Sequence, residues 1–119
     1  MYSELYEAWR RELENAELEK LPADFDVRIA DYVKKLREEG RMLDKRTLKA
    51  NLLKKEMQNV RRMVSILIRT RYDKAVRKTV KGEGVSQDAL TPEEKELYMK
   101  LPAMYEAVHS FAREIAHGH

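Results

Sequence analysis

The sequence predicts an all-α protein, a helical bundle of four to five helices with one long central helix. The composition favours helices, because 43% of the residues are hydrophobic and 38% are charged, while only four are Gly and three are Pro. The stretch from Leu43 to Lys81 contains neither Gly nor Pro and carries an apolar seam at helical spacing. With 119 residues, the chain fits a single domain, 1–119, that is large enough for its own core.

The first helix is expected to begin at Ser3. This residue is an N-cap candidate, and the acidic Glu4 and Glu7 that follow suit the positive end of the helix dipole. The apolar face of this helix is strongly aromatic and consists of Tyr2, Leu5, Tyr6, Trp9 and Leu13. The helical pattern is interrupted at Leu21-Pro22, because proline disrupts a helix interior.

A second helix follows this break. Asp24 can cap it, and Gly40 is expected to end it as the C′ residue with positive φ. Its apolar stripe consists of Phe25, Ile29, Tyr32, Val33 and Leu36.

The third helix is the long central one. We expect Asp44 to cap it and Gly82 and Gly84 to end it. About 38 residues at a rise of ~1.5 Å would give a helix roughly 55 Å long. Its seam consists of Leu48, Leu52 or Leu53, Met57, Val60, Val64, Leu67, Ile68, Tyr72, Ala75 and Val76.

A fourth helix is expected to start at Pro92. In Thr91-Pro92-Glu93-Glu94, Thr is a good N-cap, Pro suits the first helical position and the second Glu completes a capping box. Pro102 lies inside the following pattern, so it should kink this helix or begin a fifth. The apolar positions are Leu97, Leu101, Met104, Tyr105, Val108, Phe111, Ala112 and Ile115.

Positive charge is concentrated on the third helix. Residues 44–81 hold thirteen basic and three acidic side chains, a local balance of +10, although the whole chain carries only +3. These cations could contact phosphates, or pair with an acidic protein surface, including the acidic first and second helices. Pairing is the favoured interpretation, because both flanks of this segment are acidic. The candidate residues for nucleic-acid or acidic-partner contact are Arg61, Arg62, Lys74, Arg77 and Lys78, together with Arg69 and Arg71.

The aromatic face of the first helix has two interpretations. Tyr2, Tyr6 and Trp9 at helical spacing are typical of a core, but aromatic residues are also frequent interface hot spots. A chain end should fray unless something covers it, so a subunit contact is the main competitor.

Catalytic and metal-binding signals are weak. There is no Cys, and His109, His117 and His119 have no carboxylate at ligand spacing. Nucleophile motifs and a phosphate-cradling glycine loop are missing, so we expect no enzyme, no cofactor and no metal site. A small helical mutase that holds a dicarboxylate with Arg69 and Arg71 stays open as an alternative.

The location is expected to be cytoplasmic, without a membrane contact. No apolar run approaches the roughly 18 residues that span a bilayer, and Met1 to Glu4 do not resemble a signal segment.

The third helix also carries a family pattern. An Arg, an apolar stretch, an Arg-x-Arg pair, then Lys and an apolar residue follow one another in Asn59-Val60-Arg61-Arg62-Met63-Val64, Leu67-Ile68-Arg69-Thr70-Arg71-Tyr72 and Lys74-Ala75-Val76. This pattern resembles the helical (A) domain of GINS subunits, of the archaeal type in which that domain is N-terminal. The segments Leu21-Pro22-Ala23-Asp24-Phe25, Arg41-Met42-Leu43-Asp44 and Leu90-Thr91-Pro92-Glu93-Glu94 are similar to the corresponding family elements.

The resemblance implies a non-enzymatic scaffold in DNA replication. GINS subunits assemble through their helical domains and connect the MCM helicase with a RecJ-like protein; they can also contact primase. Homo-oligomerisation or pairing with a paralogous GINS subunit would follow, and a stand-alone basic module that binds DNA or RNA is the alternative. The expected subunit interface comprises Tyr2, Tyr6, Trp9, Leu13, Met57, Val64, Arg69 and Arg71.

One departure from the family concerns the end of the chain. Members of this class continue into a small β-rich B domain, whereas this sequence stops at His119. The B domain is therefore expected to be absent, either because the sequence is a piece of a longer protein or because the lineage lacks that domain. Contacts that depend on the B domain are not carried over.

Overall fold

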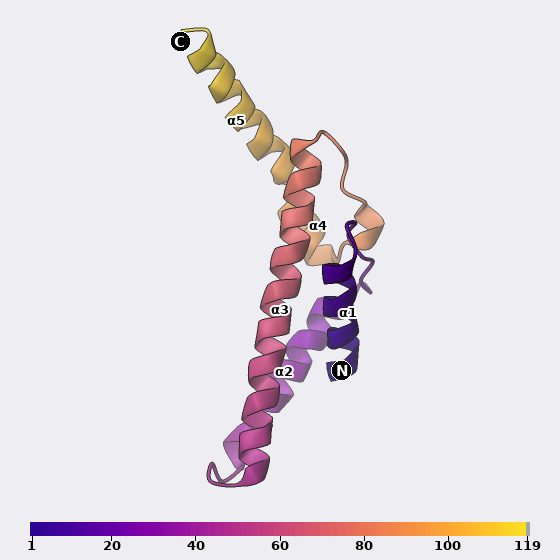
Figure 1. Cartoon of the computed structure of the whole chain (residues 1–119), viewed down its shortest axis with the longest axis vertical. Helices are drawn as coiled ribbons and strands as arrows, with labels where there is room; N and C mark the ends of the chain where they lie inside the picture. Colours follow the sequence, from indigo (N-terminus) through magenta and orange to yellow (C-terminus); the bar gives the residue numbers. More distant parts are fainter. Residues whose placement is uncertain (119) are drawn as a thin grey trace.

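Helix α3 (Leu48–Val80) is the long central element of the molecule, and the other helices lie along it or extend from its end (Figure 1). The computed structural model describes residues 1–118, which extend over 67 × 29 × 23 Å. Within them the chain forms α1 (Tyr2–Glu14), α2 (Phe25–Met42), α3, a short 3-10 helix η1 (Gln87–Ala89), α4 (Pro92–Tyr98) and α5 (Leu101–Ala116). The predicted all-α fold with one long central helix is confirmed.

The long helix begins later than the sequence suggested. Asp44 does not cap it; instead the Asp44 carbonyl accepts the N–H of Thr47 at 3.1 Å in a turn that precedes the helix. Thr47 is the N-cap, and its hydroxyl accepts the N–H of Ala50 at 3.2 Å. At the other end, Gly82 has φ of +75°, the left-handed conformation expected of a residue that ends a helix.

Gly40 does not end α2, which continues to Met42, and its φ is not positive. Its role is a close approach between helices, because a Cβ at this position would lie 3.4 Å from Cδ2 of Leu53 in α3. The first helix also differs at its start: α1 begins at Tyr2, and the Met1 carbonyl accepts the N–H of Leu5, so Ser3 lies inside the helix.

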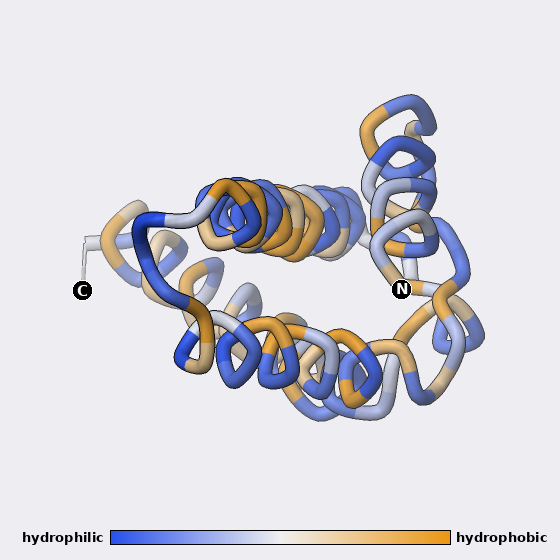
Figure 2. Tube along the Cα trace, turned by 90° about the horizontal axis from the view of Figure 1, so that it is seen from below, coloured by the Kyte–Doolittle hydropathy of each residue, from blue (hydrophilic) through white to orange (hydrophobic). Residues whose placement is uncertain are grey.

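The main core lies where α1 and α2 pack against α3. The apolar stripes expected for these three helices meet there, and each helix shows hydrophobic and hydrophilic residues on different sides of its turns (Figure 2). The fully buried members of this first core cluster are Leu5, Leu21, Phe25, Ile29, Leu36, Val60, Met63 and Leu67.

A second core cluster fixes α4 against the C-terminal half of α3. It contains Ala75, Leu90 and Tyr98. The predicted capping box is present: the Thr91 hydroxyl accepts the N–H of Glu94, and the Glu94 carboxylate accepts the N–H of Thr91. The same hydroxyl donates to Asp26 Oδ2 at 2.6 Å, which ties the start of α4 to α2.

The last helix is not packed into the bundle. Pro102 lies in the first turn of α5, so the apolar pattern is split into two helices, one of the two expected outcomes. Leu101 packs against the second core cluster, and α5 then projects away from the other helices (Figure 1). None of the residues of α5 is buried, whereas a bundle would have covered its apolar face.

Candidate functional site

Arg71 and Glu12 are the two most deeply buried charged residues among those described, each with 0% of its side chain exposed. All N–H donors of Arg71 are used. Nε and Nη2 donate to the two carboxylate oxygens of Glu94 at 2.7 Å each, Nη1 donates to Glu12 Oε1 at 2.8 Å and to the Glu19 carbonyl at 2.6 Å, and Nη2 also donates to the Ala89 carbonyl at 2.9 Å. The bidentate bond to Glu94 is the geometry in which Arg binds carboxylates best.

Lys74 completes the charge balance of this site. Its Nζ donates to Glu12 Oε2 at 2.6 Å and to two backbone carbonyls, those of Glu12 and Glu17. Two cations therefore face two carboxylates, and the set is neutral overall. We call Arg71, Lys74, Glu12 and Glu94 the Arg71 cluster. It joins α1, α3 and α4 and the segments beside Glu19 and Ala89.

The cluster keeps Arg71 charged. Burial alone would lower the pKa of Arg71, but its hydrogen bonds and its attraction to Glu94 and Glu12 raise that pKa above the ordinary value. Because every donor is bonded to a protein oxygen, Arg71 has none left for a phosphate, a substrate or another subunit. The prediction of Arg71 as an interface residue was wrong, and the mutase alternative loses one of its two arginines.

The preferred interpretation of the basic helix, pairing with acids, is confirmed for three of its cations. Arg71 and Lys74 pair with Glu12 of α1, and Lys78 pairs with Glu17 just after α1 at 2.5 Å. None of these ion pairs involves α2, which was expected to contribute. Lys74 and Lys78 are consequently engaged within the chain and are poor candidates for contact with a partner.

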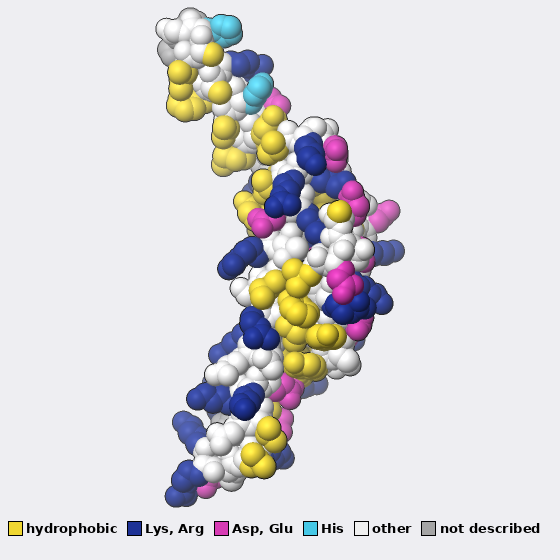
Figure 3. Space-filling view, viewed as in Figure 1, with side chains coloured by type: hydrophobic (Ala, Val, Ile, Leu, Met, Phe, Trp, Pro, Cys, Tyr) yellow, Lys and Arg dark blue, Asp and Glu magenta, His cyan; other side chains and the backbone are white. Residues whose placement is uncertain are grey.

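Four arginines of α3 behave differently. In the part of the chain that the structure describes, they are exposed and make no salt bridge: Arg61, Arg62, Arg69 and Arg77. Val60, Leu67 and Arg71 define the buried side of α3, so the helical period places Arg62 and Arg69 on the outer side and Arg61 and Arg77 on two opposite flanks. Figure 3 shows Lys and Arg side chains along the free edge of the long helix.

The aromatic face of α1 is divided between core and surface. Trp9 is half-buried against the first core cluster, and its ring lies 5.6 Å from that of Tyr6. Its Nε1 is buried and has no hydrogen-bond partner among residues 1–118. Tyr2, Tyr6 and Leu13 are exposed. The interface prediction for these three residues therefore stays a prediction, whereas Trp9 serves the core.

Two further predicted interface residues, Met57 and Val64, are half-buried against the first core cluster. Arg69 is exposed on the opposite side of α3.

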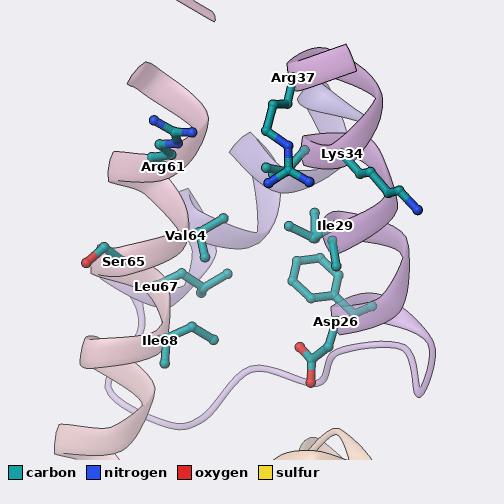
Figure 4. A pocket seen from close by; sticks show the side chains of 12 residues that line it. Asp26, Ile29, Lys34, Arg37, Arg61, Val64, Ser65, Leu67 and Ile68 are labelled. Atoms are coloured by element: carbon teal, nitrogen blue, oxygen red, sulfur yellow. The ribbon is translucent and has the colours of Figure 1, made fainter. Parts of the chain in front are cut away.

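Val64 also lines an apolar hollow of about 490 Å³ between α2 and α3 (Figure 4). Ile29 from α2 and Leu67 and Ile68 from α3 point into it. We call this the α2–α3 groove.

Charged side chains mark the two ends of the α2–α3 groove. Arg37 and Arg61 lie at one end, and Asp26 lies at the other, where it already accepts the Thr91 hydroxyl (Figure 4). Within residues 1–118 neither arginine makes a salt bridge. One end of the groove is therefore positive and uncompensated.

The second exposed apolar surface is on α5. Met104, Val108, Phe111 and Ile115 are spaced by four, three and four residues, so they form one stripe along the helix. Their exposed fractions are 65%, 57%, 62% and 59%. Figure 3 shows hydrophobic side chains along one side of the projecting helix. We call this set the α5 stripe; monomeric soluble proteins rarely leave such a continuous patch uncovered.

Sequence reasoning missed Glu12 and Glu94. The signal for Glu12 was present, because it lies seven residues after Leu5 and therefore on the apolar face of α1. Arg71 likewise lies four residues after Leu67, on the seam of α3. A charged residue at a seam position indicates a buried partner of opposite charge, since an unpaired charge there would be costly.

The histidines are not brought together. His109 stacks on Tyr105 of α5, His117 follows that helix, and His119 lies outside the described residues. Among residues 1–118, no group of three or more His, Asp or Glu side chains could hold a metal ion. In the same residues, no helix combines the length and the hydropathy needed to cross a membrane.

Tyr98 gives the site a measurable pH dependence. Burial, followed by the negative charge of Glu94, raises its pKa above the ordinary value of 10.0. Above about pH 10 the unfolded chain therefore loses this proton while the folded chain keeps it. The contribution of Tyr98 to the free energy of unfolding is fully present below about pH 10. It should fall above that pH, by at most about 1.4 kcal/mol per pH unit. Urea unfolding at pH 9, 10 and 11 should show a shallower fall for Tyr98→Phe; equal slopes for both proteins would contradict this.

The chain was compared with known protein families, proteins and structures. No family model, no curated protein and no solved structure matches the chain.

Proposed function

We propose that this chain is a non-enzymatic scaffold of a GINS-like DNA replication complex, which assembles through its helical domain. By the resemblance of its third helix, its partners would be further copies or a paralogous GINS subunit, the MCM helicase and a RecJ-like protein, with DNA or primase as additional contacts. The observation that carries the scaffold role is the α5 stripe. An amphipathic helix that is fully formed but uncovered is a surface for another polypeptide.

The buried chemistry agrees with this role. Arg71, Lys74 and Lys78 are engaged with acids of the same chain, so they hold the helices together instead of acting on a substrate. Among the surfaces that stay free are the apolar α5 stripe and the exposed arginines of α3. Tyr and Arg are among the residues that most often dominate protein interfaces.

Self-association tests the scaffold proposal directly. Sedimentation equilibrium between 1 and 100 µM should show a mass that rises with concentration above the 14.1 kDa of one chain. The associated species should then bind a purified archaeal MCM ring in a pull-down. A mass of one chain across the range would contradict assembly from this chain alone, and self-association without any binding to MCM would contradict the replication role.

A second function, a basic helical module that binds nucleic acid, is favoured by one observation. The outer side and flanks of α3 carry Arg61, Arg62, Arg69 and Arg77, which are exposed and have no acidic partner among the described residues. Neutralising phosphates with such cations releases counterions, so affinity should fall steeply with salt.

Fluorescence titrations of duplex and single-stranded DNA from 25 to 300 mM KCl test this function. The quadruple replacement of these four arginines by Gln should flatten the slope of log K against log salt by roughly three to four. The matched control for lost charge replaces four exposed lysines outside α3 by Gln: Lys20, Lys35, Lys95 and Lys100. No binding at 25 mM KCl would remove the nucleic-acid function.

A further inference from the structure

Two apolar surfaces lack a cover, and their dimensions and charges match. We propose that α5 of one copy docks into the α2–α3 groove of a second copy. This proposal rests on the self-assembly proposed above. The contact then joins two different surfaces: the α5 stripe and the groove lined by Ile29, Val64 and Ile68.

The lengths agree. The α5 stripe runs from Met104 to Ile115, which is roughly 16 Å at the ~1.5 Å rise of a helix. On α2, the lining of the groove runs from Phe25 to Arg37, which is roughly 18 Å by the same rise. A helix that lays anchors at i, i+4, i+7 and i+11 into a hydrophobic groove is a common mode of recognition.

The charges fix the direction of docking. Glu114 lies three residues after Phe111, so it flanks the α5 stripe near the C-terminal end of the helix, where the helix dipole is also negative. Arg37 and Arg61 at one end of the groove supply the complement. In this direction the positive N-terminal end of α5 lies toward Asp26 at the other end of the groove.

The occupant is a second copy, because α5 of the same chain is held away from the groove. Leu101 anchors the start of α5 in the second core cluster, at the C-terminal half of α3. From there the helix runs outward, away from α2 (Figure 1). Residues of the groove lie on α2 between Phe25 and Arg37 and on the middle of α3, so only another molecule can present its stripe to them.

A mixing experiment tests this pairing. The helix variant Val108→Glu/Phe111→Glu and the groove variant Arg61→Glu/Ile68→Glu change exposed residues, so both should fold, as checked by circular dichroism. Each variant alone should sediment as a single chain, with association weakened on the order of 100-fold. An equimolar mixture still contains one intact helix and one intact groove, so it should form a 1:1 complex of about twice the single-chain mass.

Matched controls are Glu106→Lys/Arg113→Glu on the opposite side of α5 and Arg62→Glu on α3 outside the groove; both should associate like the unmodified chain. In addition, Glu114→Arg should restore association to Arg61→Glu. If the groove variant associates normally, or the mixture stays monomeric, the pairing of α5 with the groove is overturned while self-assembly stands. If the unmodified chain is monomeric throughout, the proposed self-assembly fails as well.

Discussion

Replacing Arg71 with Met should lower the free energy of unfolding by about 3–5 kcal/mol, the usual effect of removing one member of a buried ion pair. The substitution keeps much of the volume but leaves the Glu94 carboxylate without its cation and Glu12 with Lys74 alone. Urea denaturation followed by circular dichroism and by the fluorescence of Trp9, the single Trp of the chain, measures the change. The effect should appear as a lower midpoint with an unchanged slope.

Arg69→Met is the matched control for Arg71→Met. Arg69 is two residues away on the same helix and exposed, so its replacement should stay within about 0.5 kcal/mol of the unmodified protein. The double variant Arg71→Met/Glu94→Gln should recover part of the loss, because it removes the uncompensated Glu94 carboxylate and leaves Glu12 paired with Lys74. A loss below 1 kcal/mol for Arg71→Met would show that water or Lys74 compensates the carboxylates and that the cluster is not what holds α1 and α4 on α3.

Leu5→Ala should be nearly as damaging, with a loss of about 2–5 kcal/mol. The Leu5 side chain is 0% exposed in the first core cluster, so its removal leaves a cavity between α1 and α3. Leu13→Ala is the same substitution on the same helix at a residue that is 49% exposed, and it should cost less than about 1 kcal/mol. Thermal and urea unfolding of both variants provide the comparison, and equal losses would mean that α1 is not seated through Leu5.

The long helix, the capping box at Thr91 and the break at Pro102 could be predicted because each depends on residues close together in the sequence. The predictions that Asp44 caps the long helix and that Gly40 ends the second helix were wrong for a related reason. Both are good helix-terminus residues, but Thr47 caps α3 instead, and Leu53 packs closely against Gly40 inside α2. Local preferences identify candidate ends of helices, and tertiary contacts choose among them.

Which residues contact the α5 stripe and Arg71 could not be predicted from residues close together in the sequence. Helical spacing identified the apolar side of α5 but gave no information on what covers it, so the stripe was expected in a core and is found exposed. The same spacing identified Arg71 as a cation of α3 without revealing that Glu12 and Glu94 enclose it. Residues 59 and 23 positions away in the chain supply those carboxylates, and only the three-dimensional arrangement of the helices brings them together.

The wide sequence separation within the Arg71 cluster has a consequence for synthesis on the ribosome. The Arg71 guanidinium binds oxygens of Glu12, which is translated well before Arg71, and of Glu94, which is translated after it. The Arg71 guanidinium can thus acquire its full set of hydrogen bonds only after residue 94 has left the exit tunnel. Until then the nascent polypeptide carries an Arg71 guanidinium with only part of its hydrogen bonds, and the final joining of α1, α3 and α4 is delayed until Glu94 emerges.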